Sequence, residues 1–131
     1  LRFLQELQPH MVGMGPFLRH RDTPFANEPD GSADLTLYLL SMVRLLLPKV
    51  LLPATTALGT ALEGGRERGI LHGANVVMPN LSPADVRSKY LLYHDKLATG
   101  AESANGLNQL RTNLQAIGYE AVVARGDAPT L

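Results

Sequence analysis

Two adjacent threonines and a methionine occupy positions from which side chains could orient a bound molecule. Thr55 and Thr56 follow the short apolar run KVLLPA, and Met78 ends a second apolar run, ANVVM. Threonine hydroxyls can orient a carboxylate or a hydroxyl group, whereas methionine fills an irregular apolar wall. In parallel βα folds such side chains come from the carboxyl ends of strands. The stretch 53–80 is therefore predicted to organise the chain. Strand-end threonines and a core methionine are the structural alternative.

Other side chains that could bind a ligand or act in catalysis are better explained by local structure. His20 and Asp22 could suggest a metal or an acid–base pair, but two ligands are too few for a closed zinc site. Arg19 and Arg21 flank them, which favours ion pairs within the loop. The glycine pair at 64–65 could form an anion-binding helix start, but a structural turn is favoured. Neither a Ser-His-Asp arrangement nor a pair of carboxylates for acid–base work stands out.

The elements that must position these residues follow an α/β order. Short apolar runs predict strands at 10–15, 49–54 and 74–79, and the region 119–127 is either a last strand or an extended tail. Helical spacing predicts the end of a helix at 1–8 and helices at 33–47, 64–73, from Ser82, and at 103–118. Ser32 or Asp34 is expected to cap the second of these helices. Crossover helices between strands indicate about three to four parallel strands with flanking helices, too few to close a (β/α)₈ barrel.

Composition excludes several classes of function. The 131 residues carry 12 basic and 12 acidic side chains, which argues against a nucleic-acid partner. The chain contains no cysteine, so it has neither a disulfide framework nor a thiolate cluster site. The most apolar segment, LTLYLLSMVRLLLP, is shorter than the about 20 residues of a membrane span. No signal peptide is recognised. A cytoplasmic location is expected, with which the absence of cysteine is compatible. The initial leucine indicates a piece of a longer chain.

Three separate motifs occur in an order that resembles a known family. They are MVGMGPFLRHRDTPFAN, LPATTALGTALEGGRERGILHGANVVMPNLSP and YLLY. Together they resemble the carboxyl-terminal half of the iron-iron hydrogenase maturase family of the radical S-adenosylmethionine superfamily. They also resemble, more broadly, the biotin and thiamin synthesis associated region of biotin synthase-like enzymes. The resemblance covers about residues 1–96. It implies a half TIM-type (β/α) barrel over residues 1–98, followed by a helix and tail over 99–131.

The resemblance also implies cofactors that this chain cannot hold alone. The full-length family members carry a Cys-x-x-x-Cys-x-x-Cys motif in their first half. That motif holds a 4Fe-4S cluster that reduces S-adenosylmethionine to give a deoxyadenosyl radical. The cysteine-free chain should therefore bind neither group by itself and should be inactive alone.

Candidate pocket residues are carried over from the resemblance motif by motif, and no catalytic or metal-binding residue is expected in this fragment. A radical intermediate needs a dry, shaped cavity, which apolar side chains would provide. Tyr90 and Tyr93, three residues apart on a helix, could equally form a core contact. The full set of substrate- and cofactor-pocket residues is Met11, Pro16, Phe17, Leu18, Thr55, Thr56, Met78, Tyr90 and Tyr93.

The functional expectation is the substrate and cofactor-pocket half of a radical S-adenosylmethionine enzyme. The alternatives are a biotin synthase-like or methylornithine synthase-like fragment, or a non-catalytic half-barrel assembly module. The expected partners are the amino-terminal half of the barrel and a small-molecule substrate, with neither nucleic acid nor membrane. Exposed strand edges and an uncovered barrel interior predict a homo-oligomer of the fragment.

Overall fold

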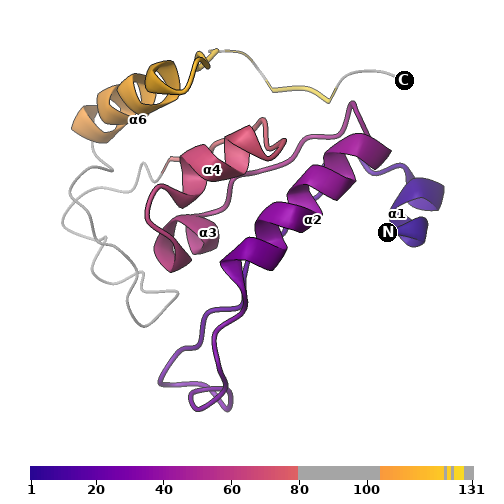
Figure 1. Ribbon diagram of the computed structural model, residues 1–131, viewed down its shortest axis with the longest axis vertical. Helices are drawn as coiled ribbons and strands as arrows, with labels where there is room; N and C mark the ends of the chain where they lie inside the picture. The colour runs from indigo at the N-terminus through magenta and orange to yellow at the C-terminus, as the bar shows by residue number, and fades with distance from the viewer. Residues whose placement is uncertain (80–103, 123, 125, 129–131) are drawn as a thin grey trace. The chain divides into compact units, whose positions relative to one another are not determined.

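The computed structural model describes residues 1–79, 104–122, 124 and 126–128 of the chain (Figure 1). The chain falls into two compact units. The first comprises Leu1–Pro16, Ser32–Met78 and Val123–Leu131. The second comprises Phe17–Gly31 and Pro79–Val122. No helix in the described part of the chain is long and apolar enough to cross a membrane.

The first unit is dominated by helix α2, Ala33–Leu46, which follows the short helix α1, Arg2–Leu7. Ser32 caps α2, because its hydroxyl oxygen accepts a hydrogen bond from the Leu35 amide at 3.1 Å. Asp34 lies in the first turn, where its charge suits the helix dipole. The expected helix and its serine cap are therefore confirmed. The inward face of α2 is fully buried and consists of Thr36, Leu37, Leu40 and Val43.

Two short helices stand where one was expected. Helix α3, Thr56–Ala61, lies in a stretch where no helix was predicted, and helix α4, Gly65–Leu71, is shorter than the predicted 64–73. Gly64 lies between the two helices and has φ +63°, a left-handed backbone conformation that glycine adopts readily. Gly65 packs directly on the carbonyl oxygen of Leu58, where a Cβ would collide. The glycine pair is thus structural, as favoured from the sequence.

Three extended segments run in parallel beneath these helices. Met11 bridges Leu51, and Pro53 bridges Val76, both in parallel orientation. Backbone hydrogen bonds of 2.9–3.1 Å support both bridges, including Val12 N–H to the Leu51 oxygen. The described residues form isolated bridges rather than continuous strands in the regions where strands were predicted. The half-barrel therefore stays a prediction.

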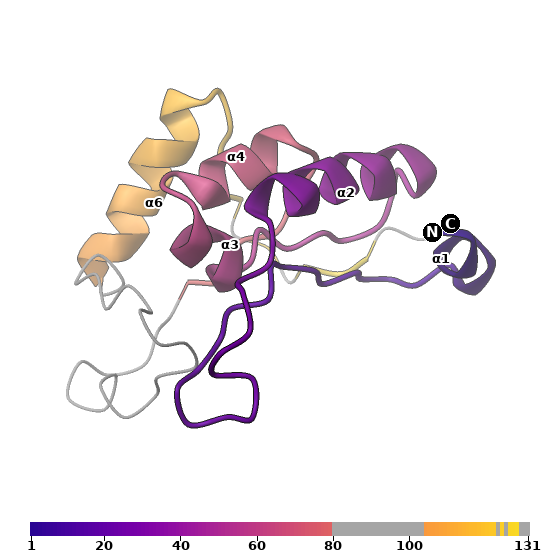
Figure 2. The ribbon, with the colours of Figure 1, turned by 60° about the horizontal axis from the view of Figure 1, so that its bottom comes forward.

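Alternate residues of the central segment face opposite sides. Ala54 faces α4, because a Cβ added to Gly69 would lie 3.2 Å from the Ala54 Cβ. Leu52 is fully buried and shares that side by strand alternation. Leu51 and Pro53, with the residues they bridge, point to the other side. Figures 1 and 2 show α2 and α4 beside each other on one side of the extended segments.

The second unit contains the loop 17–31 and helix α6, Ala104–Ala116. The helix predicted at 103–118 is therefore found over a slightly shorter range, and Leu114 is buried in it. Gly118 follows the helix with φ +82°, the left-handed conformation in which glycine often ends a helix. The helix predicted from Ser82 lies outside the described residues.

Candidate functional site

The register of the parallel segments aligns the predicted site residues. Continuing the Met11–Leu51 bridge by four residues places Gly15 opposite Thr55. Continuing the Pro53–Val76 bridge by two residues places Met78 level with Thr55. Because side chains alternate with a period of two, these positions lie on the side facing away from α4. The carboxyl ends of the three segments therefore share one level and one face.

Direct contact supports the first half of this alignment. A Cβ built on Gly15 would lie 2.7 Å from the hydroxyl oxygen of Thr55 and 3.3 Å from the Ala57 Cβ. Only a glycine lets these two segments approach so closely without displacing the hydroxyl. Gly13, by contrast, has nothing within 4 Å of its added Cβ. The close approach of the two segments therefore occurs at Gly15 and not at Gly13.

Thr55 serves a structural role that is compatible with ligand binding. Its backbone is extended, and its side-chain oxygen accepts a hydrogen bond from the Leu58 amide at 3.4 Å, which caps α3. A hydroxyl has two acceptor lone pairs and one donor hydrogen, so capping leaves the O–H to donate. Thr56 is the first residue of α3 and, like Thr55, is half-buried. The two hydroxyls therefore stand at the start of a helix, at the end of the central segment.

The two methionines of the predicted pocket are exposed to solvent. Met11 is 46% exposed and Met78 is 57% exposed, so neither is a core residue of the first unit. Met11 lies four residues before the Thr55 level, about 13 Å along an extended chain. Pro16, which follows Gly15, is buried. Met11 and Met78 thus lie on the same side of the parallel segments, at two different levels.

The loop 17–31 closes on itself within the second unit. The Gly31 amide donates to the Phe17 carbonyl oxygen at 2.7 Å, and the Arg19 amide donates to the Asp30 carboxylate at 3.0 Å. The rings of Phe17 and Phe25 meet edge to face with centroids 6.1 Å apart. The loop thereby presents an aromatic pair that sequence spacing alone did not reveal. Leu18 is half-buried.

The charged residues of this loop pair locally, as expected from the sequence. Arg19 lies 3.7 Å from Asp30, and Arg21 lies 3.7 Å from Asp22. His20 approaches the same Asp22 carboxylate at 3.9 Å, and its Nδ1 accepts a hydrogen bond from the Asp22 amide at 3.2 Å. These pairs are mostly exposed, so each contributes little to stability.

The donor set does not fit an iron–sulfur cluster. The sequence lacks cysteine, and the described residues contain no group of three histidines or carboxylates that could hold a metal ion. Thiolates hold such clusters in proteins. Any cluster would therefore need ligands from outside this sequence. Tyr90 and Tyr93, which were predicted as pocket residues, lie outside the described residues.

Asn75 is a positioning residue that sequence analysis missed. Its side-chain oxygen accepts the Leu52 amide at 2.8 Å, and its own amide donates to the Leu52 carbonyl oxygen at 2.9 Å. Asn75 thus pairs with both backbone groups of Leu52 and fixes the register that sets Met78 level with Thr55. An asparagine at the start of an apolar run was the available signal, although nothing in the sequence identified its partner.

In the first unit, helices lie between extended segments that are joined by two isolated parallel bridges. Over 97 residues, the chain is 50% identical to the FeFe hydrogenase maturase subunit HydE of Thermotoga maritima. The match covers 74% of this chain and 28% of that protein, in its carboxyl-terminal part. The chain therefore spans less than a third of the length of this relative. No family model matches the chain. The resemblance expected from the motifs is confirmed.

Proposed function

We propose that this chain forms the substrate and cofactor-pocket part of a radical S-adenosylmethionine enzyme that resembles the hydrogenase maturase. The observation that carries the proposal is the 50% identity to the carboxyl-terminal part of HydE. The alignment of Gly15, Thr55 and Met78 at the carboxyl ends of parallel segments supports it. In βα folds, this end carries the functional groups.

Within this proposal, the chain's own residues bind and orient rather than react. Thr55 keeps a hydroxyl hydrogen that can be donated to a carboxylate or carbonyl oxygen of the substrate, and Thr56 adds a second hydroxyl. Met11 and Met78 supply the apolar surface that excludes water from that space. When bound, S-adenosylmethionine would supply the radical chemistry, and Met78 is the residue proposed to contact it.

The face that carries these residues requires a further partner. Met11, Leu51 and Met78 share the side opposite α4, and in the proposed barrel this side is the interior. The amino-terminal part of the barrel would cover it and would supply the cluster ligands that this cysteine-free chain lacks. The chain is therefore proposed to be inactive alone, whether the missing part belongs to the same polypeptide or to a separate one.

A chimera tests the proposal. The matched carboxyl-terminal part of the Thermotoga maritima protein is replaced by residues of this chain, and the product is reconstituted anaerobically with iron and sulfide. We expect the chimera to cleave S-adenosylmethionine to 5′-deoxyadenosine, and the isolated chain to produce none. Cleavage by the isolated chain would contradict the proposal. So would a chimera that holds its cluster, as judged by visible absorption, and yet fails to bind S-adenosylmethionine.

Threonine variants of the same chimera test the site. Thr56→Val removes a hydroxyl while keeping the shape of the side chain, and Thr56→Ser keeps the hydroxyl. We expect Thr56→Val to raise the KM for the substrate about tenfold and Thr56→Ser to change it little, because one hydrogen bond to a bound polar group is lost. Equal behaviour of the two variants would assign Thr56 to the structure alone. The biotin synthase-like and methylornithine synthase-like alternatives predict turnover of their own substrates in this assay.

A further inference from the structure

Gly13 carries no side chain, although the described structure gives no local reason for a glycine at this position. Its φ lies outside the left-handed region, and a Cβ added to it would meet nothing within 4 Å. Gly15 differs, because its added Cβ would lie 2.7 Å from the Thr55 hydroxyl oxygen. A glycine in an extended segment lowers stability, and it often marks a place where a ligand or another backbone approaches. Gly13 therefore indicates a neighbour that is not among the described residues.

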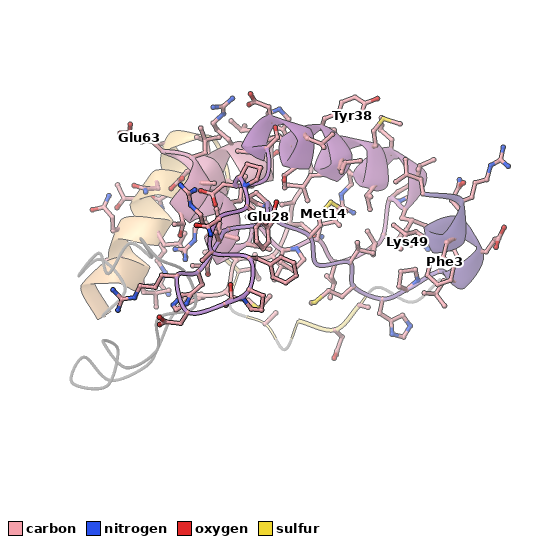
Figure 3. The ribbon with its side chains drawn as sticks, turned by 90° about the horizontal axis from the view of Figure 1, so that it is seen from below. Phe3, Met14, Glu28, Tyr38, Lys49 and Glu63 are labelled. Atoms are coloured by element: carbon pink, nitrogen blue, oxygen red, sulfur yellow. The ribbon has the colours of Figure 1, made fainter. Side chains whose placement is uncertain are left out.

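Gly13 lies on the face that carries the candidate site. Its neighbour Met14 is half-buried, and Figure 3 shows Met14 between its own segment and α2. Because side chains alternate along an extended segment, Gly13 faces the opposite side, as Gly15 does. Continuing the first parallel bridge by two residues places Gly13 opposite Pro53, about 7 Å before the level of Thr55. Gly13 therefore belongs to the face that is proposed as the barrel interior.

The described side chains around Gly13 are apolar. Pro53 lies opposite it, and the Pro53–Val76 bridge continues the same level to the third segment. One level earlier lies Met11, which is 46% exposed. One level later lies the hydroxyl of Thr55, whose hydrogen is still available for donation. Among the described residues, a molecule lying along this face would therefore meet a hydroxyl at one end and apolar surface beside Gly13.

We infer that Gly13 determines which substrates the site accepts, because its missing side chain leaves room for an uncharged part of the substrate. The inference rests on the function proposed above and adds a substrate class to it. That class is a small molecule with a hydrogen-bond-accepting group at one end, held by Thr55, and a compact uncharged body that extends about 7 Å toward Met11. A charged body is disfavoured, because it would lose water beside Pro53 and Met11 without gaining a partner.

The amino-terminal part of the proposed barrel is the other candidate neighbour of Gly13. A strand of that part would pair at the edge of the segment, about 4.8 Å to its side and in the plane of the sheet. Side chains point out of that plane, so the backbone of such a strand would not cover the face beside Gly13. A space for substrate is therefore the better explanation of the glycine. Side chains of the amino-terminal part that fill this space would overturn the inference.

Substitutions of increasing size, made in the chimera described above, test the inference. Gly13→Ala, Gly13→Val and Gly13→Leu are compared with Ala61→Leu, which adds bulk at an exposed position of α3. The first measurement is the dissociation constant for S-adenosylmethionine, which should equal that of the parent chimera in all four variants. The second is activation of an FeFe hydrogenase, the process for which the Thermotoga maritima protein is named. Activation should fall severalfold for Gly13→Ala and at least about a hundredfold for Gly13→Leu, and Ala61→Leu should leave it unchanged.

The two measurements separate failure of this inference from failure of the proposed function. A parent chimera that fails to bind S-adenosylmethionine or to activate the hydrogenase contradicts the proposed function, on which the inference depends. A parent chimera that does both, with Gly13→Leu as active as the parent, overturns the inference alone. So does loss of S-adenosylmethionine binding in Gly13→Ala, because the added methyl group would then have collided with the amino-terminal part.

Thiol labelling measures the space at Gly13 directly. Gly13→Cys is introduced into the same chimera and treated with iodoacetamide after cluster reconstitution, and the labelled peptides are identified by mass spectrometry. We expect the introduced thiol to react in the assembled protein, because the space around it is open. Thr36→Cys, at a buried position of α2, should react only after denaturation. Protection of the thiol at position 13 in the assembled chimera would mean that the amino-terminal part fills the space, and the inference would be wrong.

Discussion

The guanidinium group of Arg44 ties the end of helix α2 to the turn that follows α4. Its Nε donates to the Gly73 carbonyl oxygen at 2.8 Å, and its Nη1 donates to the Pro48 carbonyl oxygen at 2.7 Å. Both acceptors belong to backbone that leads into the parallel segments. One side chain therefore holds the backbone at the ends of α2 and α4, where the chain enters the layer that carries the candidate site.

Replacing Arg44 with methionine should lower the free energy of unfolding by about 1–3 kcal/mol. The variant leaves two carbonyl oxygens without their charged donor, although it also removes a partly desolvated cation. Arg44→Lys should recover only part of the loss, because one ammonium group cannot span both acceptors. Urea unfolding followed by circular dichroism measures all three proteins. Full rescue by lysine would show that charge, rather than the forked geometry, matters.

The effect of Arg44→Met should be independent of pH between 5 and 9. Burial lowers the pKa of the Arg44 guanidinium, because desolvation disfavours its charged form. The unfolded chain then binds that proton more tightly than the folded chain. The free energy of unfolding would therefore rise with pH, but only where the pH approaches the lowered pKa of Arg44 in the folded state. Arginine titrates so high that it remains charged in both states throughout this range. Urea unfolding at pH 5, 7 and 9 measures the difference, and a slope in that difference would contradict this account.

Gly73→Ala should destabilise the first unit more than Gly64→Ala. Gly73 has φ +101°, and a Cβ there would lie 2.6 Å from the Arg44 Cβ. Gly64 also has a positive φ, but nothing lies within 4 Å of its added Cβ. Gly64→Ala should therefore lower the free energy of unfolding by about 1 kcal/mol, through backbone strain alone. Gly73→Ala should lower it by about 2–4 kcal/mol, because the collision with Arg44 adds to the strain. Equal losses in thermal unfolding would mean that Arg44 moves aside at little cost.

Asn75→Leu should lower stability by about 1–3 kcal/mol, and Asn75→Asp by clearly less. The leucine variant removes the oxygen that accepts the buried Leu52 amide, whereas aspartate retains an acceptor in the same place. Hydrogen exchange of the Leu52 amide, followed by NMR, reports the bond directly. Protection should fall in the leucine variant and persist in the aspartate variant. If the Leu52 amide were equally protected from exchange in both variants, the Asn75 side chain would not be what fixes the pairing of these two segments.

The sequence predicted those elements whose signals are local. The serine cap of α2 and its end before Pro48 each depend on a few neighbouring residues, and both are found. Helix α3 was missed because its TALGTA sequence contains glycine and two threonines, which weaken helical propensity. The Thr55 cap and the packing of Gly65 on Leu58 compensate for that weakness through contacts that periodicity does not encode.

The candidate site shows the same division between local and distant information. Thr55 and Met78 could be selected because Thr55 follows one apolar run and Met78 ends another, and the Pro53–Val76 bridge, continued by two residues, sets them at one level. The partners that set this level could not be predicted from sequence alone. Gly15 lies 40 residues before Thr55, and Asn75 lies 23 residues after Leu52, so only folding brings each pair together.

A double-mutant cycle on Gly15 and Thr55 tests whether their contact holds the site together. Gly15→Ala alone should cost about 1–3 kcal/mol, because its Cβ meets the Thr55 hydroxyl at 2.7 Å. Thr55→Ala alone should cost about 1 kcal/mol through the lost cap of α3.

The double variant should cost less than the sum, by about 0.5–2 kcal/mol, because removing the hydroxyl makes room for the methyl group. Gly13→Ala, with open space around its added Cβ, is the matched control, and its effect should simply add to that of Thr55→Ala. Additive losses for Gly15 as well would mean that the two segment ends are not held against each other. Thr55 would then lack the rigid support that orienting a bound substrate requires.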